Sequence, residues 1–241
     1  MLKLDNVCYS VEENGKQKYI LKNINLIIND GETIVITGHN GSGKSTLMKI
    51  IMGIIPVTSG KIYFDVVDIT TMSITDRAKL GIAYAFQTPI RFKGIKVRDL
   101  LTTAQKTNSS INEVCNYLSR VGLCARDYID RPLDDKLSGG ELKRIEIATI
   151  LARSTQLSVF DEPEAGIDLW SFNNLIKVFE RMHEKTKGSI LIISHQERIL
   201  NIADRIIVIA DGSIRESGTK EEIMPSVLGS GAPCSVLTDN I

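Results

Sequence analysis

Short, continuous runs of apolar residues recur along the chain and predict its central sheet. Residues 33–37, 157–160, 190–193 and 206–209 are dominated by isoleucine, valine, leucine and phenylalanine. A run this short, without regularly alternating polar positions, is typical of a strand that is buried on both faces. Parallel strands covered by helices have this pattern, so the chain is expected to contain a parallel α/β core.

Turn and helix patterns surround the first of these runs. Residues 20–28 predict another strand, and Asn29, Asp30 and Gly31 predict the turn that joins it to 33–37. Apolar residues then recur at helical spacing from 45 to 55. Pro56 is expected to end that helix, because proline lacks an N–H and cannot sit in a helix interior.

The middle of the chain differs from its flanks. Residues 95–153 show helical spacing that Gly122 and Pro132 interrupt, and strand patterns return only afterwards. At the last strand, Asp211 and Gly212 predict a tight hairpin turn. We therefore predict a single domain over residues 1–241. Its α/β core comprises 1–87 and 157–225, its helical insertion 88–156, and its peripheral, weakly patterned tail 226–241.

Composition excludes several classes of protein. Lys plus Arg and Asp plus Glu both number 29, so direct binding of nucleic acid through bulk positive charge is excluded. No apolar run approaches the roughly 18 residues that span a bilayer, and no signal peptide is visible. The four scattered cysteines contain no Cys-x-x-Cys pair, which favours free thiols in a reducing compartment. A cytoplasmic protein without a transmembrane segment is expected, and any membrane part would come from a partner.

One glycine-rich loop follows the pattern GxxxxGK[ST], since residues 38–45 read GHNGSGKS between a predicted strand and a predicted helix. Its glycines allow backbone N–H groups to turn inward around an anion, and the helix adds the positive end of its dipole. Lys44 is expected to reach the β- and γ-phosphates of a nucleoside triphosphate, and Ser45 to help hold Mg²⁺. A turn that merely caps a helix needs neither side chain. The residues expected to bind nucleotide here are Gly38, His39, Asn40, Gly41, Ser42, Gly43, Lys44, Ser45 and Thr46.

The apolar run 157–160 leads directly into two acids, Asp161 and Glu162. A carboxylate at the end of a buried strand suits Mg²⁺, and the neighbouring Glu162 could polarise an attacking water as a general base. A solvated turn is the alternative, and the presence of the glycine-rich loop favours the functional interpretation. Gln87 and His195 also follow strand-like runs, and either could orient water or sense the γ-phosphate.

A second helix start has features of an anion site. Ser138 and Glu141 have the spacing of a capping box, which by itself needs no ligand. Gly139 and Gly140 are not required for capping and cost helix stability, so they suggest the close approach of a phosphate. One arrangement that uses both anion sites is a symmetric dimer, in which each chain completes the site of the other.

Taken in order, these motifs resemble those of the ATP-binding cassette (ABC) ATPases. The resemblance covers about residues 1–220, and the sequence LSGG at 137–140 is highly specific to that family. It implies an α/β fold, namely a RecA-like P-loop NTPase core with an antiparallel β subdomain and an inserted α-helical subdomain. It also implies an ATP hydrolase that uses ATP and Mg²⁺ and forms an ATP-dependent head-to-tail homodimer.

The resemblance also implies roles for the acids and polar residues of the core. Glu162 corresponds to the catalytic base and His195 to the switch histidine. Gln87 is expected to meet Mg²⁺ alongside Ser45 and Asp161, and to couple the site to a partner protein.

Further positions follow from the same resemblance. Ser138, Gly139 and Gly140 become the signature that contacts the nucleotide of the other chain, and Asp168 becomes the D-loop aspartate. Alignment of the chain start puts Val11 where transporter ATPases commonly stack adenine on an aromatic ring. Weak selectivity for the base is therefore expected.

Within the family, residues 78–87, 89–94 and 143–146 are most similar to the SufC group, the soluble ATPases of iron–sulfur cluster assembly. This likeness implies a soluble SufB/SufD-like scaffold protein as partner, which would carry the cluster. Two alternatives stay open. The chain could be the nucleotide-binding subunit of an ABC membrane importer, with identical chemistry, or a nucleotide-gated clamp with little turnover, against which Glu162 and His195 argue.

Overall fold

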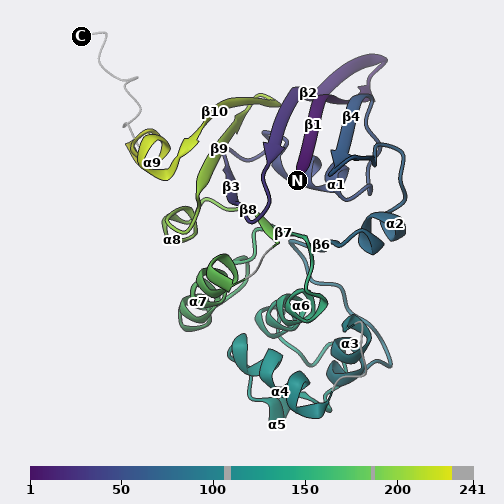
Figure 1. The fold of residues 1–241 in the computed structure, drawn as a ribbon, viewed down its shortest axis with the longest axis vertical. Coiled ribbons are helices and arrows are strands. Elements are labelled where there is room, and N and C mark those ends of the chain that lie inside the picture. Colours follow the sequence, from purple (N-terminus) through teal and green to yellow (C-terminus); the bar gives the residue numbers. More distant parts are fainter. Residues whose placement is uncertain (106–109, 186–187, 230–241) are drawn as a thin grey trace, which may run out of the picture.

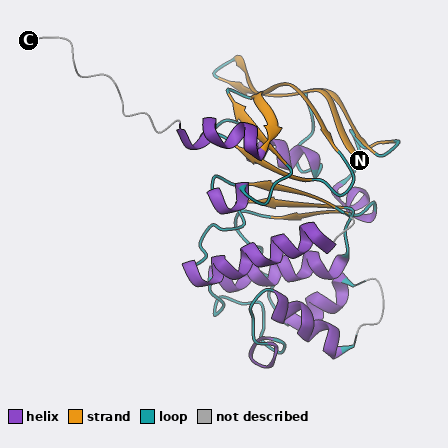
Figure 2. Ribbon diagram, turned by 60° about the vertical axis from the view of Figure 1, so that its left-hand side comes forward, coloured by secondary structure: helices purple, strands orange, loops and turns teal. Residues whose placement is uncertain are grey.

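The computed structural model describes residues 1–105, 110–185 and 188–229. Its strands form a four-stranded sheet in the order β2-β1-β4-β5 and a six-stranded sheet in the order β10-β9-β3-β8-β7-β6. Figure 1 shows the smaller sheet at one end of the molecule and a group of helices at the other. The six-stranded sheet lies between them, which is clearest in Figure 2.

The larger sheet is parallel except for its last strand. Its members are β3 (Thr33–Thr37), β6 (Ile82–Ala85), β7 (Leu157–Asp161), β8 (Ser189–Ile193), β9 (Arg205–Ala210) and β10 (Ser213–Thr219). Every residue of β3, β7 and β8 is buried, which confirms the interpretation of the short apolar runs. The hairpin predicted at Asp211 and Gly212 is also present, and it joins β9 to the antiparallel β10.

The smaller sheet is antiparallel and is built on a long hairpin. It consists of β1 (Leu2–Glu13), β2 (Lys16–Ile28), β4 (Ser59–Phe64) and β5 (Val67–Asp68). The predicted strand 20–28 is therefore the second half of β2. The first half of β2, residues 16–19, is fully exposed and has no apolar face that marks it as a strand. The register between β1 and β2 shifts at three places, all within residues 4–10 of β1.

The first helix is shorter than predicted. Helix α1 covers Lys44–Ile51 and ends well before Pro56, because Gly53 follows with a φ of 75°. The buried Arg77 guanidinium donates hydrogen bonds to the carbonyl oxygens of Ile50 at 2.8 Å and Ile51 at 2.7 Å. A long-range side chain thus satisfies the carbonyls that continuation of the helix would otherwise satisfy.

The remaining helices include the predicted helical middle of the chain. They are α2 (Ile74–Lys79), α3 (Val97–Ala104), α4 (Ile111–Arg120), α5 (Ala125–Tyr128), α6 (Gly139–Arg153), α7 (Leu169–Lys185), α8 (Glu197–Leu200) and α9 (Lys220–Gly229). Helix α9 crosses the boundary set at 225 and 226 for the tail, and it contains Pro225. The rest of that tail, residues 230–241, lies outside the described residues.

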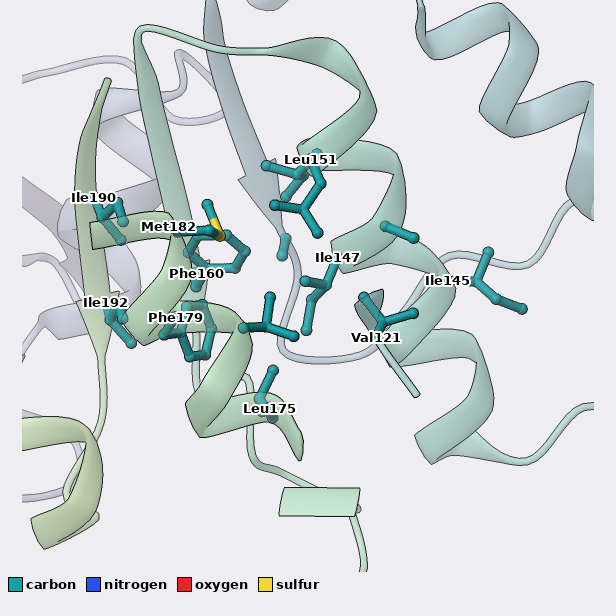
Figure 3. Close-up of a cluster of buried hydrophobic side chains, with 14 of the residues drawn as sticks. Val121, Ile145, Ile147, Leu151, Phe160, Leu175, Phe179, Met182, Ile190 and Ile192 are labelled. Carbon is teal, nitrogen blue, oxygen red and sulfur yellow. The ribbon is translucent and has the colours of Figure 1, made fainter. Parts of the chain in front are cut away.

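Helix α6 is fixed to the large sheet by an apolar core. Buried side chains of α6, α7, β7 and β8 form one cluster on this face of the sheet, and α1 and the antiparallel sheet form another on the opposite face. Figure 3 shows Phe160 of β7 against Phe179 of α7, with ring centroids 4.9 Å apart in an edge-to-face arrangement. Ile147 and Leu151 extend from α6 toward the same cluster. The C-terminal half of α6 is therefore anchored in a packed core.

Candidate active site

The glycine-rich loop leaves β3 and opens α1 in a conformation that requires glycine at two points. Gly38 has a φ of 139°, and a Cβ there would lie 2.1 Å from the carbonyl oxygen of Ile209. Gly43 has a φ of 104°, and its Cβ would lie 2.6 Å from the side chain of Leu21. Both values are far below any normal contact. The loop is thus pressed against β9 on one side and β2 on the other.

The lysine of the loop spans it from inside. Lys44 is buried, and its Nζ donates to the carbonyl oxygens of Gly38 at 2.6 Å and His39 at 2.8 Å. Burial lowers the pKa of Lys44, while the nearby Glu162 and Asp161 act in the opposite direction. Ser42 Oγ is buried and has no hydrogen-bond partner among the described residues. A buried hydroxyl of this kind costs free energy, which a phosphate oxygen in the loop would offset.

Asp161 at the end of β7 is held from two sides. Ser45 Oγ donates to its Oδ1 at 3.2 Å, and the Tyr84 hydroxyl donates to its Oδ2 at 2.8 Å. Burial raises the pKa of Tyr84, and the negative charge of Asp161 raises it further, so the phenol stays a donor. Sequence reasoning missed Tyr84. The signal was its position in the strand-like run before Gln87, since neighbouring parallel strands end at the same sheet edge.

The predicted base and the predicted coupling glutamine meet at that same edge. The Gln87 amide donates to Glu162 Oε2 at 2.6 Å, although 75 residues separate them in the chain. Glu162 has a φ of 44°, a left-handed conformation that is uncommon outside glycine. Its N–H donates to the carbonyl oxygen of Ile193 in β8 at 3.1 Å. In this structure the Gln87 side chain is therefore hydrogen-bonded to Glu162, while Ser45 and Asp161 are hydrogen-bonded to each other.

His195 lies exposed just beyond β8, near a second acid, the half-buried Glu164. Ser194 Oγ donates to Glu164 Oε1 at 2.5 Å, and Glu164 Oε2 is buried without a partner in the described part of the chain. Burial raises the pKa of Glu164, and the Ser194 hydrogen bond and the charge of His195 both oppose that rise. Sequence reasoning gave Glu164 no role. Its position two residues after Glu162 was the available signal.

The start of α6 has the predicted capping box. Glu141 N–H donates to Ser138 Oγ at 3.2 Å, and Ser138 N–H donates to Glu141 Oε2 at 2.7 Å. A Cβ on Gly140 would lie 3.4 Å from the carbonyl oxygen of Gly166, so this glycine faces the chain's own 164–168 loop. A Cβ on Gly139 would meet nothing within 4 Å. Nothing inside the described chain therefore accounts for glycine at 139.

The other predicted site residues surround this centre. Asp168 caps α7, because its Oδ1 accepts from Ser171 N–H at 3.0 Å. Val11 lies half-buried in β1 opposite Lys18 of β2, and Ile20 of the same β2 approaches the loop at Gly43. His39, Asn40 and Gly41 are exposed in the loop, and Thr46 is in α1.

None of the contacts described above at the site involves one of the three cysteines in the described ranges. Cys8, Cys115 and Cys124 are free thiols, and Cys234 lies outside the described residues. Over the described ranges, no group of His, Cys, Asp and Glu side chains is arranged to hold a metal ion by itself.

A mostly parallel sheet that carries this loop defines a P-loop nucleoside triphosphatase. Residues 21–165 match the family model described as ABC transporter, so the chain belongs to the ABC transporter ATPase family. It is accordingly an ATP hydrolase that uses ATP and Mg²⁺. In the ranges that the structure describes, no helix has the length and apolar character needed to cross a membrane.

Several relatives are similar over most of the chain. An uncharacterised ABC transporter ATP-binding protein of Methanocaldococcus jannaschii is 42% identical over 213 residues, which are 85% of this chain and 84% of the relative. An energy-coupling factor transporter ATP-binding protein of Clostridium acetobutylicum is 31% identical over 236 residues, 94% of this chain and 82% of the relative. The iron–sulfur cluster assembly protein SufC of Plasmodium berghei is 33% identical over 230 residues, 88% of this chain and 62% of the relative.

A solved structure supports the same assignment. A dimeric ATP-binding cassette in a post-hydrolysis state, bound to ADP and phosphate, superposes with a TM-score of 0.80 at 25% identity, covering 91% of this chain and 99% of the other. The fold predicted from the motifs is thereby confirmed.

Proposed function

We propose that this chain is the nucleotide-binding subunit of an ABC membrane transporter and that ATP-driven closure of two such chains drives its partner. The observation that carries the proposal is the likeness, along nearly the whole chain, to an ATP-binding protein of an energy-coupling factor transporter. The importer alternative from the sequence is therefore preferred to the iron–sulfur interpretation.

Residues 38–46 would hold the triphosphate. The loop fits it because Gly38 and Gly43 keep the backbone in a shape that side chains would prevent, and because Ser42 Oγ is buried without a partner among the described residues. Lys44 would exchange its two carbonyl partners for phosphate oxygens. Such an exchange is favourable because the phosphate oxygens carry negative charge, which attracts the ammonium more strongly than the neutral carbonyls do. Val11 is the residue of β1 proposed to lie beside the base.

Ser45, Asp161 and Gln87 would hold Mg²⁺, which, when bound, neutralises charge on the phosphates. Their oxygen atoms suit a hard cation. Ser45 and Asp161 already lie 3.2 Å apart. Gln87 would have to leave Glu162 to join them. This rearrangement would free Glu162 Oε2 at the moment when the site fills.

Glu162 would then act as general base and take a proton from the attacking water as the bond between the β- and γ-phosphates breaks. His195, exposed beside it, would contact the γ-phosphate. Ser138, Gly139 and Gly140 would complete the site of the second chain, with Asp168 at the same interface. The open space at Gly139 supports this role, because a close neighbour from outside the chain explains a glycine there.

Affinity capture tests the partner. The Glu162→Gln variant, loaded with ATP, would be captured from native membrane and cytosolic fractions, with Lys44→Ala as the control that should not bind nucleotide. Recovery of a multispanning permease by Glu162→Gln and not by Lys44→Ala supports the proposal. Recovery of a soluble scaffold that carries iron and labile sulfide would overturn it in favour of the second candidate.

That second candidate is the SufC-like ATPase with a soluble SufB/SufD-like scaffold in the cytoplasm. The observation in its favour is the similarity of residues 143–146 to the SufC group, together with the likeness to a SufC protein. The active-site chemistry would be the same in both cases, so only the partner distinguishes them.

A further inference from the structure

Helix α6 carries a fully buried lysine on the side that faces the active site. Lys143 is 0% exposed. Its Nζ donates to the backbone carbonyl oxygens of Phe86, of Gln87 at 3.1 Å and of Asp161 at 3.4 Å. The three donors of an ammonium group are thus all directed at the backbone beside two proposed site residues.

One helical turn later, a glutamate holds the same segment from its other side. Glu146 Oε1 accepts a hydrogen bond from Phe86 N–H at 3.0 Å, while its Oε2 is buried without a partner among the described residues. Burial raises the pKa of Glu146 to about 7, and the charge of Lys143 works against that rise. Lys143 and Glu146 therefore grip both the N–H and the C=O of Phe86.

Burial of Lys143 and Glu146 lowers the stability of the fold unless their contacts compensate for the lost hydration. Taking an ammonium and a carboxyl group out of water is costly before any compensation, and apolar residues of similar volume are often as stable or more so. The contacts that the pair makes are with backbone next to Gln87 and at Asp161, and its own helix begins at Ser138 to Gly140. It links the proposed signature to the proposed coupling residue.

We infer that Lys143 and Glu146 are positioning residues that clamp the Phe86–Gln87 segment to helix α6, so that the signature and Gln87 move as one body. The inference rests on the proposed roles of Gln87 and of Ser138 to Gly140. When the second chain contacts the first turn of α6, the clamp passes any displacement of that turn to the Gln87 backbone, while the C-terminal half of the helix stays packed on the sheet. Contact made with the nucleotide of the second chain is thereby transmitted to the Gln87–Glu162 hydrogen bond of the chain's own site.

A double-mutant cycle tests whether the clamp acts through Gln87. The variant Lys143→Met/Glu146→Met removes both buried ionisable groups and keeps unbranched side chains of similar length, which limits the loss of stability. We expect its kcat to fall about tenfold with an unchanged KM for ATP, because a small misplacement of a positioning group costs at least that much. In a Gln87→Ala background, the same two substitutions should change kcat less than about twofold.

Arg153→Gln is the matched control. Arg153 is on the same helix and also donates to a distant backbone carbonyl, that of Ala78 at 2.9 Å, but it does not contact the Phe86–Gln87 segment. Its effect on kcat should be the same with and without Gln87→Ala. If the Lys143→Met/Glu146→Met and Gln87→Ala effects multiply instead, the clamp does not act through Gln87 and the inference is wrong.

Amide exchange at Phe86 gives a readout that is independent of hydrolysis. Because Glu146 accepts this N–H, its exchange should accelerate at least about tenfold in Lys143→Met/Glu146→Met and stay unchanged in Arg153→Gln. If Gln87→Ala hydrolyses ATP at the wild-type rate, the proposed role of Gln87 is wrong. Amide exchange at Phe86 then tests by itself whether Lys143 and Glu146 hold this segment. Unchanged exchange at Phe86 in the double variant would overturn it.

Discussion

The Gln87 amide and the Glu162 carboxylate are joined by a hydrogen bond of 2.6 Å between the ends of β6 and β7. The oxygen that would accept a proton from water is therefore engaged by the chain itself. Under the roles proposed for the two residues, filling of the site would move Gln87 away from Glu162, and the ends of β6 and β7 set the positions from which the two side chains start.

Replacement of Glu162 by Gln is expected to separate nucleotide binding from hydrolysis. The amide keeps the size of the side chain but cannot accept the proton, so the rate of phosphate release should fall by about 10²–10⁴-fold. ATP should still bind, and the variant should accumulate as a dimer on size-exclusion chromatography. Lys44→Ala serves as the control, because it should lose binding itself. Hydrolysis at the wild-type rate in Glu162→Gln would place the base elsewhere.

Tyr84→Phe is expected to weaken the response to Mg²⁺. The change keeps the ring, which lies edge-to-face against Phe86 at 4.6 Å, and removes only the hydroxyl that donates to Asp161. Loss of one such hydrogen bond costs about 1 kcal/mol, so the Mg²⁺ concentration for half-maximal ATPase activity should rise about fivefold. Titration of activity with Mg²⁺ measures this, with Tyr117→Phe on α4 as control. An equal response in the two variants would show that Tyr84 does not position Asp161.

Glu146 is expected to make stability depend on pH between its unfolded and folded pKa values. Burial raises the pKa of Glu146 from 4.5 to about 7, so the folded state holds the proton more tightly than the unfolded state. The contribution of protonated Glu146 to the free energy of unfolding is therefore fully present below pH 4.5 and is lost as the pH rises through 7. The loss amounts to roughly 3 kcal/mol.

Urea unfolding at pH 5 and pH 8 measures this effect in the wild type and in Glu146→Gln. From pH 5 to pH 8, the free energy of unfolding of the wild type should fall more than that of Glu146→Gln. All other titrating groups are the same in the two proteins, so the difference reports on Glu146. Parallel curves would mean that Glu146 titrates normally.

Arg77→Met is expected to destabilise the fold and not the chemistry. Arg77 satisfies the carbonyls of Ile50 and Ile51 at the end of α1 and those of Met72 and Thr70. Leaving buried carbonyls without donors costs about 1–3 kcal/mol each where water cannot reach them. The midpoint of thermal unfolding should fall by several degrees, while kcat of the folded fraction stays within about twofold. A selective loss of kcat would instead link Arg77 to the loop at the other end of α1.

Much of the central sheet could be predicted because its strands are short and buried on both faces, so that composition alone marks them. The glycine-rich loop was predictable for a related reason, since Gly38 and Gly43 sit where no side chain fits. Both features depend on residues that are adjacent in the chain, so a short stretch of sequence is enough to predict them.

Long-range contacts explain what could not be predicted. Lys143 and Glu146 have the composition of a helix surface, and only the fold shows that they face the Phe86–Gln87 segment. The last carbonyls of helix α1 accept hydrogen bonds from Arg77, which lies 26 residues beyond Ile51 in the chain. Helix α9 runs through Pro225 and past the boundary predicted between 225 and 226, and its residue Ile223 is buried against the core, a contact that only the fold shows.

The open space around Gly139 implies that a substitution can raise the stability of the single chain and still weaken the association of two chains. Alanine is favoured over glycine in a helix by up to about 1 kcal/mol, and a methyl group at 139 would meet no atom of the chain within 4 Å. A search for heat-resistant variants of the isolated protein would thus select alanine at this position. Under the role proposed for Gly139, such a protein would be more stable as a single chain and would close less well on a second chain. A gain in thermal stability would then come with a loss of ATPase activity.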